Sequence, residues 1–322
     1  MKNITKLLSK LLLAIILVTT IPSFSKAQGS GIIQQPGYYN LKVGELQVVI
    51  LSDGTLPLDM GKLLSNAHPD EIEDAFQRNF LTPNVESSTN VYLVRTGGKL
   101  VLVDAGAGEL FGPTLGQLIK SLANAGFKPE QIDAVLITHM HPDHVGGLTN
   151  NGNIVFPNAT VYIEKAESDY WLSEQNKKNA SDMVKPFFDY AQNAVSPYSQ
   201  AGKLKTFTYG ATLFPGITAL ASAGHTLGHT SFAVESKGEK FLILGDLVHA
   251  LAVQFKDPAV TIKFDNDEHA AYKARKKFFD EAVQGKYLIA ASHLPFPGFG
   301  HIRADKQSYI WFPANYSTIA AK

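Results

Sequence analysis

The sequence contains no cysteine among its 322 residues. It can therefore form no disulfide, and a metal site in this chain must use nitrogen and oxygen ligands, because thiolates are absent. An excess of charge is also lacking, since 29 basic and 29 acidic side chains give a formal net charge of zero. A chain without a basic stripe has no electrostatic footprint for nucleic acid or for an anionic membrane. We expect its partner to be a small neutral molecule rather than a nucleic acid.

Long apolar runs are absent after the first 27 residues. Within residues 1–27, three lysines at 2, 6 and 10 precede an apolar run at 11–18, and small residues stand at 25 and 27, which is typical of a secretory signal peptide cleaved after Ala27. The run is short for a transmembrane span, and an uncleaved N-terminal anchor is the alternative. We expect residues 28–322 to form a single periplasmic or secreted domain without membrane contact, because no linker divides them.

A cluster of histidines follows the apolar run 134–137, which predicts a buried strand. His139 and His141 stand two positions apart, whereas ligands on a helix are expected three or four apart. This spacing suits an extended chain just past a strand end. Asp143 and His144 follow a turn and can therefore face a second metal.

Further polar residues stand directly after other predicted strands. They are Asp104, His225, Asp246 and His293. Because ligands from several strand ends can converge on one edge of a pair of sheets, we predict a site with two metals at that edge.

The two metals would divide these side chains between them. One metal would take His139, His141 and His225, and the other would take Asp143, His144 and His293. Asp246 has oxygens on both sides and would bridge the metals. Two residues that are not ligands, Asp104 and His229, would support the site through hydrogen bonds.

Two metals about 3.5–4 Å apart would share a hydroxide whose pKa lies near neutral, and this hydroxide would be the nucleophile. Asp143 and Asp246 would then be the catalytic carboxylates. Residues 28–322 contain no G-x-S-x-G, S-x-x-K or G-x-x-x-x-G-K motif, so no side-chain nucleophile or phosphate loop competes with this interpretation.

The remaining pattern predicts both strands and helices. We expect strands at 41–51 closed by a turn at 52–54, and a helical cover over a cleft at 174–201. The other predicted elements are two hairpins, at 90–95 with 99–104 and at 231–235 with 240–244, and helices at 69–80, 113–125, 165–172 and 268–283.

The H-x-H-x-D-H cluster, together with Gly224-His225-Thr226, Gly245-Asp246 and Ser292-His293, resembles the metallo-β-lactamase superfamily. The resemblance implies an αββα sandwich, in the α/β class, with the metal site at one edge of the two sheets. Within the superfamily, segments such as 110–116, 252–255 and 287–303 are similar to the methyl parathion hydrolases.

That second resemblance implies a substrate pocket walled by Phe111, Trp171 and Phe187, although core packing is an alternative for each ring. His249 would line the same pocket, where an aliphatic residue is expected, and Leu227 replaces a proline. These departures affect the substrate and not the metal chemistry, because pockets discriminate strongly when polar groups are left unpaired.

We therefore expect an exported dinuclear hydrolase acting on an organophosphate triester, an aryl ester or a lactone. Its cofactors would be two divalent ions, zinc in first place and manganese, cobalt or iron as alternatives. A β-lactamase is the alternative function, but Asp246 disfavours it, and a nuclease, a glyoxalase II-like thioesterase or a binding protein without turnover is less favoured. Exposed aromatic residues would suit a homodimer.

Overall fold

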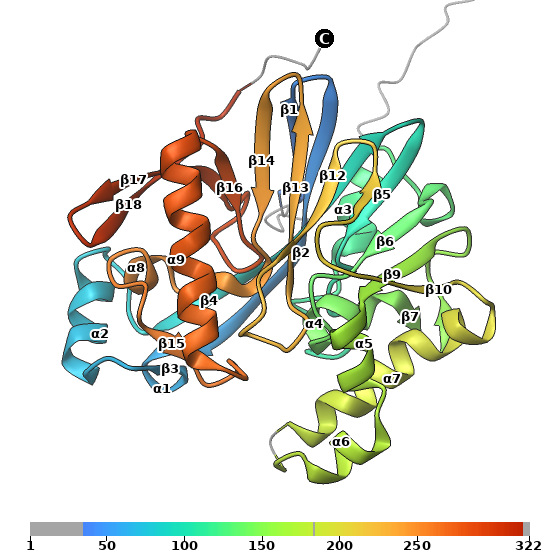
Figure 1. Ribbon diagram of the computed structural model, residues 1–322, viewed down its shortest axis with the longest axis horizontal. Coiled ribbons are helices and arrows are strands. Elements are labelled where there is room, and N and C mark those ends of the chain that lie inside the picture. Colours follow the sequence, from blue (N-terminus) through green and yellow to red (C-terminus); the bar gives the residue numbers. More distant parts are fainter. Residues whose placement is uncertain (1–34, 183, 318–322) are drawn as a thin grey trace, which may run out of the picture. The chain divides into compact units, whose positions relative to one another are not determined.

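Two seven-stranded sheets lie face to face in the computed structural model, which describes residues 35–182 and 184–317 (Figure 1). The signal peptide expected at 1–27 lies outside the described residues. Residues from Pro36 onward form one compact unit. Among the described residues, no helix has the length and apolar content needed to cross a bilayer.

The first sheet has an antiparallel half and a parallel half. Its first four strands form antiparallel pairs, and β5, β6, β9 and β10 then run parallel. Parallel strands end at the same edge of a sheet, so the segments that follow β5, β6 and β9 meet there. In spatial order the strands are β1 (Tyr38–Val43), β2 (Leu46–Asp59), β4 (Asn84–Thr96), β5 (Lys99–Val103), β6 (Ala134–Leu136), β9 (Thr160–Glu164) and β10 (Leu204–Phe207).

The second sheet is antiparallel except for one parallel pair, β14 with β16. Its strands, in spatial order, are β11 (Thr212–Phe214), β12 (Ile217–Ala221), β13 (Thr230–Ser236), β14 (Glu239–Ile243), β16 (Leu288–Ala290), β17 (Phe299–Asp305) and β18 (Ser308–Pro313). Two small ribbons complete the strands: β3 (Leu64–Ser65) with β15 (Thr261–Ile262), and β7 (Thr149–Asn150) with β8 (Asn153–Ile154).

Helices lie outside the pair of sheets (Figure 1). They are α1 (Met60–Leu63), α2 (Pro69–Gln77), α3 (Leu118–Asn124), α4 (Pro142–Val145), α5 (Lys165–Trp171), α6 (Glu174–Asn179), α7 (Lys185–Gln200), α8 (Leu251–Gln254) and α9 (Glu268–Gly285), with short 3₁₀ turns at Pro129–Gln131, Gly146–Leu148 and Gly245–Leu247.

Three apolar layers hold these parts together, because each sheet buries both of its faces. One layer packs the first sheet against α3, α5 and α7, for example through Leu122 and Phe188. A second lies between the sheets, and a third packs the second sheet against α9 through Phe278 and Phe279. This order of helix, sheet, sheet and helix confirms the predicted αββα sandwich.

Both predicted hairpins are present, as β4 with β5 and β13 with β14. The predicted turn at 52–54 is wrong, because β2 passes through it with a bulge between Ser52 and Gly54 and keeps its pairing with β4. The helix expected from residue 113 begins only at Leu118, since Gly116 adopts a left-handed φ of 73°. The segment 174–201 contains the predicted helices, as α6 and α7.

Candidate metal centre

Five strand ends deliver polar side chains to one edge of the sandwich. Asp104 follows β5, and residues 139–144 follow β6 in the first sheet. His225, Asp246 and His293 come from segments after β12, β14 and β16 in the second sheet. The five histidines predicted as metal ligands are all buried, with an exposed fraction of 7% or less for each.

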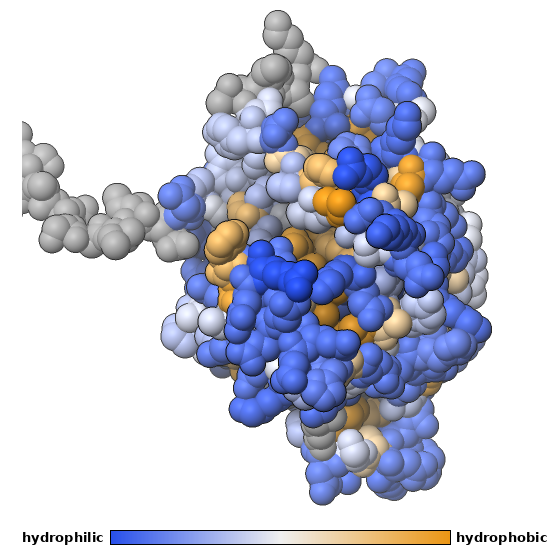
Figure 2. Space-filling model, turned by 90° about the vertical axis from the view of Figure 1, so that its left-hand side faces the viewer, coloured by the Kyte–Doolittle hydropathy of each residue, from blue (hydrophilic) through white to orange (hydrophobic). Residues whose placement is uncertain are grey.

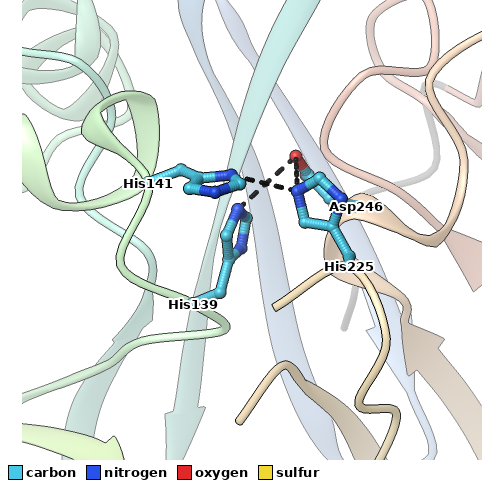
Figure 3. Close-up of side chains that lie close together, drawn as sticks. All are labelled: His139, His141, His225 and Asp246. Carbon is cyan, nitrogen blue, oxygen red and sulfur yellow. Dashed lines mark hydrogen bonds and ion pairs between the residues drawn. The ribbon is translucent and has the colours of Figure 1, made fainter. Parts of the chain in front are cut away.

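The first group of candidate ligands consists of His139, His141, His225 and Asp246, whose ligand atoms lie within 4.8 Å of one another. Figure 3 shows the three rings and the carboxylate pointing toward a common centre. His225 Nε2 lies 3.0 Å from His141 Nδ1 and 3.4 Å from Asp246 Oδ2. His139 Nε2 lies 3.6 Å from the same Asp246 oxygen. The structure thus brings together the three histidines predicted for the first metal.

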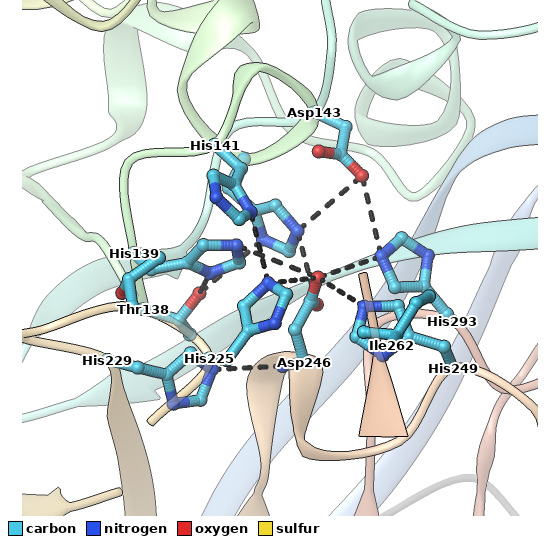
Figure 4. Close-up of polar contacts among 12 residues, drawn as sticks. Thr138, His139, His141, Asp143, His225, His229, Asp246, His249, Ile262 and His293 are labelled. Atoms are coloured by element: carbon cyan, nitrogen blue, oxygen red, sulfur yellow. Dashed lines mark hydrogen bonds and ion pairs between the residues drawn. The ribbon is translucent and has the colours of Figure 1, made fainter. Parts of the chain in front are cut away.

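The second group consists of Asp143, His144 and His293. Asp143 Oδ2 lies 3.6 Å from His144 Nε2 and 3.4 Å from His293 Nε2. Asp246 adjoins this group as well, because its Oδ1 lies 3.2 Å from His144 Nε2 and its Oδ2 lies 3.1 Å from His293 Nε2. Figure 4 shows Asp246 between the two groups. This is the position required of a bridging carboxylate.

The chemistry of these groups fits divalent cations. His139 Nε2, His144 Nε2 and Asp246 Oδ1 are buried and have no hydrogen-bond partner among the described residues. A buried polar atom without a partner costs about 1–3 kcal/mol, and a cation at the centre of each group would satisfy these atoms. Burial also holds the pKa of His139, His141 and His225 well below the usual value, so these rings carry lone pairs at neutral pH.

His293 in the second group has the opposite shift. Burial disfavours its charged form, but the carboxylates of Asp246 and Asp143 outweigh burial and raise the pKa of His293 to about 9. The surplus of negative charge in this group therefore attracts a positive charge, which a divalent cation would supply in place of the proton.

The outward-facing nitrogens of the rings are fixed by buried acceptors. Asp104, at a left-handed φ of 64°, accepts from the Thr138 N–H at 2.8 Å and lies 2.9 Å from His144 Nδ1. This arrangement confirms that Asp104 supports the histidine loop. His225 Nδ1 lies 2.8 Å from Asp265 Oδ1. Each contact directs the opposite nitrogen toward the centre.

The remaining histidines differ in their distance from the site. His229 supports the site in the predicted way, since its Nε2 accepts the Asp246 backbone N–H at 3.0 Å. His68 and His269 are exposed, and His301 lies at the surface with Nδ1 3.2 Å from the Tyr287 carbonyl oxygen. These last three histidines belong to neither ligand group.

Sequence reasoning missed Glu167, which joins the loop that carries His139 and His141 to the loop that carries His225. Its carboxylate accepts the backbone N–H groups of Met140 and Gly228, each at 2.8 Å, and the Thr226 hydroxyl at 2.7 Å. It is 1% exposed and lies on α5, a helix whose sequence looks polar and solvated. Only the packing of α5 against both loops reveals this role, just as only the fold places Asp265 beside His225.

A small apolar cavity of about 120 Å³ opens on the two groups. Phe111, Phe187 and His249 lie in its wall, as the resemblance to the methyl parathion hydrolases predicted for a substrate pocket. The remaining wall residues are Leu56, Leu58, His141, Pro142, Asp143, Asp246, Phe264 and His293.

Trp171 does not lie in this wall, so its predicted place in the pocket is wrong and the alternative, core packing, holds. It is 2% exposed and packs behind His141, with ring centroids 5.5 Å apart, and against Phe188 at 4.6 Å. Its indole N–H donates to Glu167 at 2.8 Å, which draws the ring into the core. Trp171 therefore supports the ligand His141 from behind.

His249 contacts the carboxylate of Asp246 as well as lining the cavity. Its Nε2 lies 3.1 Å from Asp246 Oδ2, and its ring stacks on His293 with centroids 5.0 Å apart. Asp246, His249 and His293 form a third set of side chains that could hold an ion. A polar ring therefore faces the cavity beside the two ligand groups.

Comparison with known proteins agrees with this geometry. The family model of the metallo-beta-lactamase superfamily matches residues 85–293. The crystal structure of hydrolase AbOPH, described as in the beta-lactamase superfamily, is similar with a TM-score of 0.84 and 34% identity, covering 88% of this chain and 100% of that one. AidC, a dizinc quorum-quenching lactonase solved with a product, has a TM-score of 0.82 and 29% identity, covering 88% and 99%.

Among curated relatives, an N-acyl homoserine lactonase of Bacillus cereus is 23% identical over 221 residues, which cover 63% of this chain and 79% of the relative. A ribonuclease of Thermus thermophilus is 26% identical over 246 residues, and the match covers 70% of this chain but only 52% of the ribonuclease. The family match spans most of the described residues and all the candidate ligands from His139 to His293. The chain therefore belongs to the metallo-beta-lactamase superfamily and is a metal-dependent hydrolase of that superfamily.

Proposed function

We propose that this protein hydrolyses neutral lactones and carboxylic esters, with two zinc ions held by the two ligand groups that meet at Asp246. The observation that carries the proposal is the position of Asp246, which lies 3.1–3.6 Å from nitrogens of both groups at the floor of an apolar cavity. The seven ligands would be His139, His141, Asp143, His144, His225, Asp246 and His293.

Two bound divalent ions would supply Lewis acidity and would lower the pKa of water toward neutrality. The chain would supply the rest. Asp246 would fix the spacing of the ions, and Asp143 would complete the second group on the cavity side. The apolar wall would exclude bulk water, which strengthens every electrostatic interaction within the site.

The cavity favours a neutral substrate, because apolar side chains such as Leu56, Phe111 and Phe264 form its wall. His249 favours a lactone or carboxylic ester whose polar atoms can pair with its ring, because its buried Nδ1 has no hydrogen-bond partner among the described residues. Phosphotriester hydrolysis would then be a weaker side activity.

A second apolar cavity, of about 480 Å³, adjoins the first and shares His249 and His293 with it. Its apolar lining includes Phe76, Leu81 and Val85. Figure 2, which views the α2 side of the molecule, shows hydrophobic residues in hollows between hydrophilic ones. The cavity would accept an apolar tail such as the acyl chain of N-hexnoyl-L-homoserine, the product named with the dizinc lactonase.

The first test is hydrolysis by the purified chain, with its metal content measured, of an acyl lactone, an aryl ester, methyl parathion and a cephalosporin. We expect the lactone and the ester to be hydrolysed fastest and methyl parathion more slowly. Turnover of the cephalosporin alone would favour the alternative, a β-lactamase, and would contradict the role given to Asp246. Metal binding without any turnover would refute the proposed function.

The apolar tail is tested with a series of lactones of increasing acyl length. We expect kcat/KM to rise about fourfold for each added methylene, since burial of a methylene contributes about 0.8 kcal/mol. Leu81→Ser should reduce this increment, because Leu81 lines the second cavity and is 46% exposed. Ile119→Ser, at a similarly exposed residue of α3, is the matched control and should leave it unchanged.

Export is the last part of the proposal. A chain produced with its own N-terminus should reach the periplasm or the medium with a mass that begins at Gln28, as the signal-peptide pattern of residues 1–27 predicts. Mass spectrometry of each cell fraction checks this. Retention in the cytoplasm at full length would contradict it.

A further inference from the structure

The segment 105–117, between β5 and α3, carries Phe111 into the wall of the metal cavity and is named the Phe111 loop below. Four of its glycines adopt left-handed φ angles between 59° and 80°, namely Gly106, Gly108, Gly112 and Gly116. Glycine loses much conformational freedom on folding, so a segment with this composition needs strong contacts to keep one conformation.

Asp53 supplies three such contacts from β2. Its Oδ2 accepts the backbone N–H groups of Ala107 at 2.8 Å and Gly116 at 3.2 Å, and its Oδ1 accepts that of Leu118 at 2.9 Å. The bulge between Ser52 and Gly54 leaves Asp53 as the extra residue of the strand. One carboxylate therefore holds both ends of the Phe111 loop.

The buried environment of Asp53 indicates that its carboxylate serves the backbone N–H groups of the Phe111 loop rather than a cationic side chain. The side chain is fully buried, and no lysine or arginine forms an ion pair with it among residues 35–182 and 184–317. Burial raises the pKa of Asp53 to about 6, and the three N–H groups limit the rise. A Cβ at Gly106 would lie 2.5 Å from Asp53 Cγ, so the approach of the loop to the carboxylate requires glycine at that position.

The Phe111 loop also has room to move if this contact is lost. A surface cavity of about 530 Å³ lies against it, lined by Asp53, Gly108, Gly112 and other residues. The start of the loop is attached to the ligand segment as well, because the Ala105 N–H donates to the His144 carbonyl oxygen at 2.8 Å. Release of the end of the loop near Gly116 would therefore displace Phe111 more than the candidate metal ligands.

We infer that Asp53 is a positioning residue for the proposed reaction, which holds the Phe111 loop so that Phe111 stays in the wall of the substrate cavity. The inference rests on the proposed function for its kinetic readout. Asp53 belongs neither to the wall of the 120 Å³ cavity nor to the two ligand groups. It therefore acts through the loop and sets substrate affinity without taking part in the chemistry.

The test is Asp53→Asn in the metal-loaded chain. The amide keeps the shape of the carboxylate but offers an NH₂ group to the loop donors, which breaks at least one of the three contacts. We expect KM for an aryl ester to rise about tenfold, kcat to stay within about twofold, and the content of two metals to be unchanged. Asp133→Asn is the matched control, since Asp133 accepts the Leu100 N–H at 2.9 Å outside the loop.

A double-mutant cycle separates positioning from general damage. In a Phe111→Ala background, Asp53→Asn should cause no further rise in KM, because both changes remove the same contact with substrate. A rise of the same size in both backgrounds, or an unchanged KM in the single variant, would overturn the inference. Loss of the whole fold in Asp53→Asn would also overturn it, since Asp53 would then determine more than this loop.

A second pair of variants tests the loop without changing Asp53. Gly112→Ala, at a φ of 80°, strains the loop beside Phe111, whereas Gly126→Ala, at a φ of 89°, applies the same strain after α3. Neither added Cβ meets an atom within 4 Å beyond its chain neighbours. Only Gly112→Ala should raise KM, and equal effects of the two would overturn the inference.

Hydrogen exchange gives a readout that does not depend on turnover. Amides of the Phe111 loop should exchange about tenfold faster, or more, in Asp53→Asn than in the unchanged protein, while those of 138–147 should not. If the unchanged protein hydrolyses no ester or lactone, the proposed function fails, but unchanged exchange in the variant would overturn the positioning role itself.

Discussion

The ligand loop, residues 138–147, and the Phe111 loop, residues 105–117, are joined by backbone hydrogen bonds, yet they are held in different ways. In the ligand loop, several buried acceptors fix the chain and its rings, with Asp104 beside His144 at 2.9 Å and Glu167 on the Met140 N–H at 2.8 Å. In the Phe111 loop, the glycine-rich chain is held by one buried carboxylate, that of Asp53, and by backbone bonds such as that from the Thr55 N–H to the Thr114 carbonyl oxygen at 3.1 Å. The ligand loop, which would carry the chemistry, is thus fixed by several buried side chains. The Phe111 loop, which would set the specificity, is fixed by fewer.

The largest expected effect comes from removing the residue shared by both ligand groups. Asp246→Ala should reduce kcat/KM by about a thousandfold or more and lower the metal content to one ion or none, because both groups lose an oxygen ligand. Activity assays and elemental analysis check this. Near-normal turnover with two metals would refute the bridging role and, with it, the contrast between the two loops.

Glu167→Gln should weaken the support of the ligand loop without changing a candidate metal ligand. We expect a loss of metal affinity of about tenfold to a hundredfold, because the amide cannot accept all the donors from Met140, Thr226 and Gly228. Competition with a chromophoric chelator measures it. Glu174→Gln, in the first turn of α6, is the control, and an equal loss there would contradict the prediction.

Phe111→Ala should affect the substrate side alone. KM for aryl esters should rise about tenfold, which corresponds to about 1.4 kcal/mol, while kcat and metal content stay near their usual values. Phe312→Ala, at a ring that is 43% exposed on β18, serves as the control. A fall in kcat without a change in KM would show that the two loops are not separable.

The smallest effect is expected at Trp171. Its size and kind distinguish a ring in the wall of the substrate pocket from a ring in the hydrophobic core. Trp171→Phe removes the N–H donated to Glu167 and should lower the free energy of unfolding by about 1 kcal/mol, with KM for aryl esters unchanged. Thermal unfolding and steady-state kinetics check this. A raised KM with unchanged stability would return Trp171 to the wall of the substrate pocket.

The same contrast explains how much the sequence alone could predict. The two ligand groups follow from local signals, because each ligand stands shortly after an apolar run that predicts a strand, whereas the αββα sandwich is implied by the resemblance to the superfamily. His139 and His141 stand two apart in the extended chain after β6, so both side chains reach the same ligand group. Asp53, Glu167 and Asp265 gave no such signal, since the partners that reveal them lie 54, 61 and 40 positions away.

Boundaries failed where backbone detail decided them. The strand β2 continues through the predicted turn with a bulge between Ser52 and Gly54. The helix α3 begins at Leu118 and not at residue 113, because Gly116 has a left-handed φ. Trp171 illustrates the other limit, because an aromatic residue near a ligand is readily assigned to a pocket wall until the partner of its N–H is known.

The two ligand groups take side chains from both sheets. Residues 139–144 come from the first sheet, and His225, Asp246 and His293 come from the second. Bound ions would therefore be cross-links between the halves of a chain that has no cysteine to form a covalent one. Unlike a disulfide, such a cross-link has a strength set by the surrounding metal concentration, about 4 kcal/mol at a thousand times the dissociation constant. The durability of the fold would then vary with the medium, and scarcity of metal would loosen the two sheets as well as stop hydrolysis.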